Sequence, residues 1–110
     1  MLTPNINLKN KTILVTGAAG FIGSNLVKEL LKTVQPIHIV GIDNISDYYD
    51  TSIKDYRLNK IDELSKEYPQ SSWNFVKGNI ADKVLVDKLF ADYDFSVVVN
   101  LAAQAGVRYS

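Results

Sequence analysis

The chain has 110 residues, 46% of them hydrophobic, and its 12 Lys and Arg residues balance 12 Asp and Glu residues. This size and composition predict one globular domain. The zero net charge gives no field that would favour nucleic acid or an anionic membrane surface. The absence of cysteine excludes disulfides and thiolate metal sites. Since no apolar stretch has the length of a signal peptide or a membrane span, we expect a soluble, cytoplasmic protein.

The first predicted element is a strand at residues 12–16, and a turn with Gly17, Gly20 and Gly23 follows it directly. An amphipathic run over residues 24–34 then predicts a helix. Glycines at this spacing allow a sharp turn, close approach of phosphate to the backbone, and tight packing of the helix on the sheet. The unpaired amides and the dipole of the helix N-terminus favour an anion at this point. The pattern therefore predicts a dinucleotide diphosphate site.

The first helix is expected to pack through an apolar stripe of Ile22, Leu26, Leu30 and Val34 and to end before Pro36. Its spacing of three to four residues matches one face of a helix.

A second strand is predicted at residues 37–42, and its almost wholly apolar sequence indicates burial on both faces. Asp43 follows, twenty residues after Gly23, where the ribose-binding acid of a dinucleotide site lies. We expect its carboxylate to accept hydrogen bonds from the adenosine ribose and to repel a 2′-phosphate, while Asn44 stands where a phosphate-binding arginine would lie. The cofactor is therefore expected to be NAD rather than NADP. A loop-capping role for Asp43 is the structural alternative.

Further helices are predicted at residues 53–68 and after the capping residue Asp82, and further strands at residues 73–77 and 95–101. Alternating strands and helices predict an α/β, Rossmann-like, doubly wound parallel sheet, with right-handed crossovers giving the strand order 3-2-1-4. The residues expected to face the core from these two helices are Ile53, the stem of Arg57, Ile61, Leu64, Val86, Leu89 and Phe90.

The fourth strand carries consecutive valines, as a central strand does, yet it would lie at the edge of this sheet. A bare apolar edge is a pairing site that proteins usually cover. We therefore expect residues 1–110 to be the N-terminal part of an NAD-binding domain whose remaining strands and substrate domain are absent. The isolated fragment is expected to self-associate through this strand.

Three other patterns are interpreted as structural. Tyr56 and Lys60 have the Tyr-x-x-x-Lys spacing of nicotinamide reductases, but their helix follows the adenosine-binding strand, whereas hydride chemistry occurs beyond the fourth strand. His38 lies near the start of its strand, away from the ligand-binding carboxyl ends. No metal site is expected, since no dense ligand cluster accompanies the nearby acids Asp47, Asp50 and Asp55.

Several segments resemble the extended short-chain dehydrogenases, which include the nucleotide-sugar epimerases and dehydratases. They are residues 15–24, 41–44, 76–82 and 98–103, with Asn79 in place of the usual Asp of the adenine-contacting turn. Residues 43–50 and 100–110 resemble the UDP-glucuronate 4-epimerase branch in particular.

This resemblance assigns roles to residues by their place in the motifs. It implies that Gly17, Gly20, Phe21, Ile22 and Gly23 hold the pyrophosphate, Asp43 and Asn44 the ribose, and Asn79 and Ile80 the adenine. Leu101, Ala102, Ala103 and Gln104 would line the path to the nicotinamide, and Arg108 would meet an acidic sugar or a diphosphate, with an ordinary surface arginine as the alternative.

The resemblance also implies a reaction for the parent protein, expected to be a homodimer in polysaccharide biosynthesis. A UDP-hexuronic acid or UDP-hexose would be inverted at C4 through a 4-keto intermediate, with hydride passing to NAD and back. The catalytic Tyr-x-x-x-Lys pair is expected beyond Ser110, so the isolated chain should be inactive. A 4,6-dehydratase and a non-catalytic NAD-binding sensor are the alternatives, and a methyltransferase fits the glycine spacing poorly.

Overall fold

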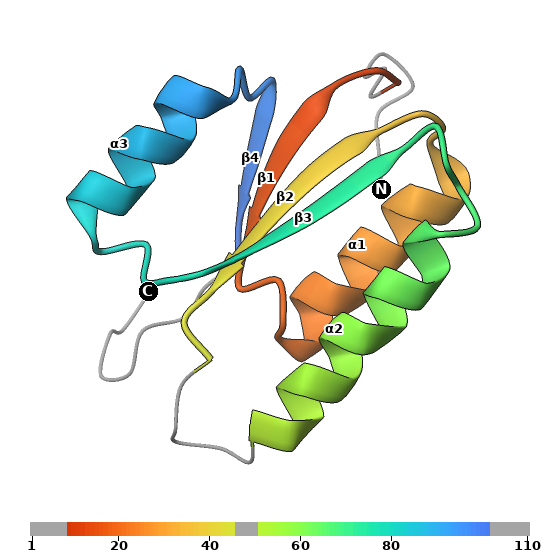
Figure 1. Ribbon diagram of the computed structural model, residues 1–110, viewed down its shortest axis with the longest axis horizontal. Helices are drawn as coiled ribbons and strands as arrows, with labels where there is room; N and C mark the ends of the chain where they lie inside the picture. The colour runs from red at the N-terminus through yellow and green to blue at the C-terminus, as the bar shows by residue number, and fades with distance from the viewer. Residues whose placement is uncertain (1–8, 46–50, 102–110) are drawn as a thin grey trace, which may run out of the picture.

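The computed structural model describes residues 9–45 and 51–101, in which four strands alternate with three helices (Figure 1). All strand pairs are parallel, and the order is β3-β2-β1-β4, as predicted. No helix in this part of the chain is long and apolar enough to cross a membrane. The elements are β1 (Thr12–Thr16), α1 (Phe21–Thr33), β2 (His38–Asp43), α2 (Thr51–Ser65), β3 (Ser72–Lys77), α3 (Lys83–Asp92) and β4 (Val97–Asn100).

Helices α1 and α2 cover one face of the sheet and α3 covers the other (Figure 1). Successive side chains of a strand point to opposite faces. In β1, Ile13 and Val15 accordingly join the core beneath α1 and α2, whereas Leu14 joins the core beneath α3. Both faces of the central strands are buried, which explains their nearly continuous apolar sequence.

The structure corrects the predicted face of α1. The helix begins at Phe21, immediately after its N-cap Gly20, and so includes the last part of the glycine motif. Its buried side is formed by Gly23, Val27, Leu30 and Leu31, while Ile22 is 67% exposed. The predicted stripe was therefore wrong at Ile22, which lies at the start of the helix, whereas Leu30 is buried and Leu26 and Val34 pack against the core as predicted.

Two other predicted core residues are also exposed. Ile53 is 49% exposed because it lies in the first turn of α2, which extends past the ends of the strands (Figure 1). Phe90 is likewise 49% exposed and packs edge-on against Phe95, with ring centroids 5.2 Å apart. Ile61 is fully buried and Asp82 caps α3 through the amide of Leu85, both as predicted.

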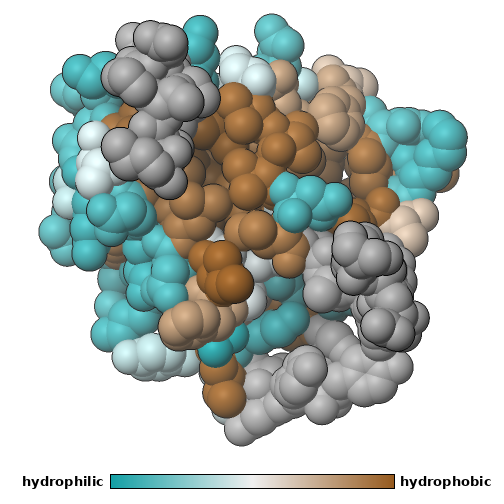
Figure 2. Space-filling model, turned by 180° about the vertical axis from the view of Figure 1, so that it is seen from behind, coloured by the Kyte–Doolittle hydropathy of each residue, from teal (hydrophilic) through white to brown (hydrophobic). Residues whose placement is uncertain are grey.

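Strand β4 forms one edge of the sheet, paired only with β1 among the described strands. Its Val98 is 47% exposed, and Leu101, immediately after the strand, is 37% exposed. Figure 2 shows apolar surface gathered in the middle of this side of the molecule. The apolar edge expected from the sequence is therefore present in this part of the chain.

Substitution of Ile61 with alanine should test the packing of α2. We expect I61A to lower the free energy of unfolding by about 3 kcal/mol, because it leaves a cavity in the larger core. The matched variant I53A removes the same atoms from an exposed position of the same helix and should cost less than about 1 kcal/mol. Urea unfolding of both variants measures the difference; equal losses would contradict the packing described above.

Candidate functional site

The carboxyl ends of β1 and β2 lie side by side, because the two strands are parallel neighbours. Backbone hydrogen bonds join the turn after β1 to the carboxyl end of β2. The amides of Gly17 and Ala18 donate to the carbonyl of Ile42 over 2.9 and 3.3 Å, and the amide of Gly20 donates to the carbonyl of Gly17 over 3.0 Å. The turn therefore brings the start of α1 close to Asp43, the last residue of β2.

Two of the three glycines are required by the fold itself. Gly17 has a φ of 71°, in the left-handed region that favours glycine. A Cβ atom on Gly23 would overlap the carbonyl group of Gly17, so the first turn of α1 could not lie against the preceding loop.

Gly20 is different. Its φ of −74° is open to any residue, and among the described residues the one atom near a Cβ at this position would be the Gly17 carbonyl oxygen, 3.2 Å away. These residues would need to adjust by only a few tenths of an ångström to accept alanine here. The fold therefore requires glycine less strictly at position 20 than at positions 17 and 23.

The start of α1 presents donors for such a ligand. The amides of Phe21, Ile22 and Gly23 precede the first intrahelical hydrogen bond, which runs from Ser24 to the Gly20 carbonyl over 2.9 Å. The N-cap Gly20 has no side chain to occupy these donors. Together with the helix dipole, they favour an anion such as a diphosphate.

Asp43 is buried, and both of its carboxylate oxygens accept hydrogen bonds within the protein. Oδ2 accepts from the amide of Ala19 over 3.0 Å, and Oδ1 accepts from the amide of Ile45 over 2.9 Å. Lys54 of α2 forms an ion pair with Oδ1, also at 2.9 Å. The predicted alternative of a loop-capping aspartate is therefore realised.

Lys54 was not predicted from the sequence, and Arg57 was assigned only a packing role. Arg57 donates from Nη1 to the carbonyl of Ala19 over 3.3 Å, so one cation of α2 reaches Asp43 and another reaches the turn. One signal was present: a lysine in the first turn of a helix opposes the helix dipole, which indicates a specific partner. The partner itself is eleven residues away in the sequence, at the end of β2.

Thr16 connects β1 to β4. Its hydroxyl donates to Oδ1 of Asn100 over 2.6 Å and accepts from the amide of Leu101 over 2.9 Å. These two contacts fix the point where the chain leaves β4, next to the glycine-rich turn.

The other predicted site residues follow the carboxyl ends of β2, β3 and β4. Asn44 is exposed beside Asp43, and Ile80 packs against the core beneath α3. Asn79 is exposed, and its Oδ1 already accepts from the amide of Ala81 over 2.8 Å. Leu101 directly follows β4. The predicted residues that lie outside the described ranges are Ala102, Ala103, Gln104 and Arg108.

The residues interpreted as structural lie as follows. Tyr56 and Lys60 are exposed on α2, with the lysine Nζ 5.3 Å from the centroid of the tyrosine ring. His38 begins β2, so it lies at the amino ends of the strands, away from the glycine-rich turn. Its Nδ1 lies 2.8 Å from Oγ of Ser72. Asp55 is exposed, and Asp47 and Asp50 lie outside the described residues.

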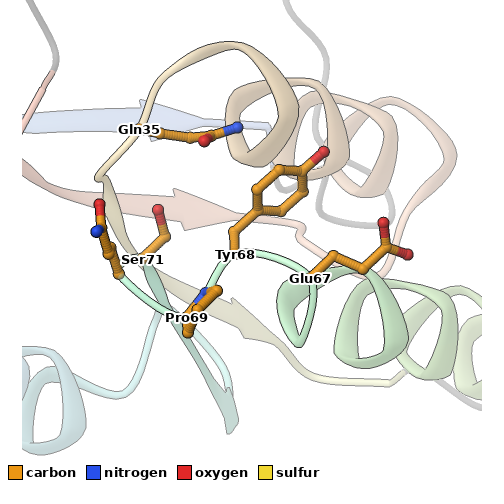
Figure 3. A pocket seen from close by; sticks show the side chains of 6 residues that line it. Gln35, Glu67, Tyr68, Pro69 and Ser71 are labelled. Carbon is orange, nitrogen blue, oxygen red and sulfur yellow. The ribbon is translucent and has the colours of Figure 1, made fainter.

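A hollow of about 240 Å³ also lies at the amino ends of the strands, beside the starts of β2 and β3 (Figure 3). It is therefore separate from the turn that carries the glycines. The residues lining it are Gln35, Glu67, Tyr68, Pro69, Gln70 and Ser71.

Comparison with known proteins identifies relatives of this chain. The model of the GDP-mannose 4,6 dehydratase family matches residues 14–110. Protein CapI of Staphylococcus aureus is 46% identical over 98 residues, which make up 89% of this chain and 27% of that protein. UDP-glucuronate 4-epimerase 2 of Arabidopsis thaliana is 41% identical over 99 residues, 90% of this chain and 21% of that protein.

A solved structure is similar in both fold and sequence. The dTDP-glucose 4,6-dehydratase of Bacillus anthracis str. Ames, in complex with NAD, aligns with a TM-score of 0.67 and 33% identity over 86% of this chain and 27% of that one. The chain thus spans less than a third of each of these relatives. It belongs to the extended short-chain dehydrogenase family of nucleotide-sugar epimerases and dehydratases.

Proposed function

We propose that this chain binds NAD, with the diphosphate in front of the first turn of α1. The observation that carries this proposal is Gly20, the N-cap of α1, where no side chain stands between a ligand and the first amides of the helix. Around it, the open amides of α1 supply donors of the right charge. The similar Bacillus anthracis dehydratase was solved in complex with NAD, which supports the same cofactor here.

The adenosine half would bind along the ends of β2 and β3. Asp43 would accept a ribose hydroxyl at Oδ2 while keeping the Ala19 amide, and its charge disfavours a 2′-phosphate. Asn44 adjoins this position. Asn79 and Ile80 would contact the adenine, and residues 101–104 would lead toward the nicotinamide.

For the whole protein we propose a nucleotide-sugar epimerase that inverts C4 of a UDP-hexuronic acid or UDP-hexose. The likeness to the Arabidopsis UDP-glucuronate 4-epimerase supports this substrate class. The bound NAD would supply hydride acceptance and return at C4. The described residues would bind and orient the cofactor, and Arg108 would pair with the sugar acid or a diphosphate.

A 4,6-dehydratase is the second candidate. It is supported by the description of the matching family and by the Bacillus anthracis structure. Both reactions begin with hydride removal at C4, so both require the same cofactor half.

The first test separates the roles of two glycines in cofactor binding. We expect G20V to weaken NAD affinity at least about tenfold, because its side chain would occupy the space proposed for the diphosphate. Its thermal midpoint should also fall, because valine is a poorer N-cap than glycine and its Cβ would lie 3.2 Å from the Gly17 carbonyl oxygen. Isothermal titration calorimetry measures the affinity.

The comparator is G23A, whose added Cβ overlaps the Gly17 carbonyl and should lower the thermal midpoint more than G20V does. Unchanged NAD affinity of a folded G20V protein would refute the proposed diphosphate position.

The second test identifies the reaction of the full-length protein. With UDP-glucuronate we expect a product inverted at C4, detected by NMR, and none from residues 1–110 alone. A 4-keto-6-deoxy product from dTDP-glucose or GDP-mannose would indicate the dehydratase instead. Binding of NAD without turnover of any of these sugars would favour the sensor.

A further inference from the structure

Arg57 is a half-buried residue of α2 whose head group reaches the glycine-rich turn. Its Nη1 donates to the Ala19 carbonyl over 3.3 Å, and its Cζ lies 5.8 Å from the centroid of the Phe21 ring. The two contacts lie on either side of Gly20 in the sequence. One guanidinium therefore touches both flanks of the residue that would approach the diphosphate most closely.

The backbone of Ala19 is held from both directions. Its amide donates to Oδ2 of Asp43 over 3.0 Å, while its carbonyl accepts from Arg57. Ala19 is fully buried, so both of its polar groups depend on partners within the protein. Side chains from β2 and α2 thus help to fix the two peptide groups that flank this residue.

The Ala19 carbonyl belongs to the same peptide group as the Gly20 amide, which donates to the Gly17 carbonyl. Rotation of this peptide would break that bond and redirect the negative end of its dipole. The rotated carbonyl oxygen would face the Gly17 carbonyl oxygen, so the turn that positions the start of α1 could not keep its present shape. The hydrogen bond from Arg57 opposes this rotation, because the rotated carbonyl would leave its donor.

We propose that Arg57 is a positioning residue for the dinucleotide. It acts through Ala19 and Phe21 by holding the turn in the orientation that accepts a diphosphate. This role rests on the proposed NAD site, and it assigns to α2 a part in cofactor affinity.

Charge alone is a separate explanation, since any cation near the diphosphate would help binding. The two explanations differ in their dependence on geometry and salt. The planar guanidinium can donate to a carbonyl and lie over a ring together, whereas an ammonium group does not reproduce both contacts. Longer-range attraction between exposed charges is screened by salt, whereas a short hydrogen bond inside the protein is screened much less.

The experiment measures NAD affinity by calorimetry in the full-length protein for R57Q, R57K and the control K60Q. K60Q removes the same charge from the next turn of α2, at a side chain that is 47% exposed. We expect R57Q to bind NAD about tenfold more weakly, the factor expected when a hydrogen bond from a charged group is lost. R57K should remain at least about threefold weaker, and K60Q should stay within about twofold of the unsubstituted protein.

The ratio of the NAD dissociation constants of R57Q and the unsubstituted protein should be the same at about 0.05 M and about 0.5 M NaCl. Full recovery in R57K, a ratio that disappears at high salt, or an R57Q affinity within twofold would each overturn the inference. If R57Q does not fold, the comparison of R57K with K60Q still separates geometry from charge. Absence of NAD binding by the unsubstituted protein would instead contradict the proposed function, and this inference with it.

Discussion

The arrangement of the site depends on the contact between the Asp43 carboxylate and the Ala19 amide, which joins the end of β2 to the turn after β1. Parallel pairing brings these two strand ends together, but pairing alone does not fix the turn. The buried carboxylate does so, and Lys54 balances its charge at 2.9 Å. Because removal of one partner from a buried ion pair leaves an uncompensated charge, this contact couples α2 to the turn as well.

The same carboxylate also holds the backbone that follows β2. Asp43 holds Ala19 and Ile45 through backbone amides, and Ile45 has a φ of 51°, which is unusual for a β-branched residue. The protein thus accepts local backbone strain at the point where the ribose would bind. Strain of this kind is found where the surrounding contacts determine the conformation.

The fold could be predicted from the sequence because β1, β2 and β4 are short apolar runs and β3 is bounded by clear turn residues. The order 3-2-1-4 then followed from the handedness of crossovers. The faces of helices were less predictable: Ile22, Ile53 and Phe90 fit a helical period but lie near element ends, where the sheet no longer covers them. Lys54 and Arg57 were missed as site residues because their partners, Asp43 and Ala19, are distant in the sequence and become neighbours only through the packing of α2 against α1.

The glycine-rich turn and β4 are not independent parts of the site, because Thr16 belongs to the end of β1 and its hydroxyl contacts both Asn100 and the amide of Leu101. A change in the direction of β4 would therefore move Leu101 relative to the glycine-rich turn. A dinucleotide bound as proposed would span both positions, so either reaction of the family would need this spacing to be fixed. The cofactor half can accordingly be shared by epimerases and dehydratases, while the choice of sugar and product depends on residues that the cofactor does not contact.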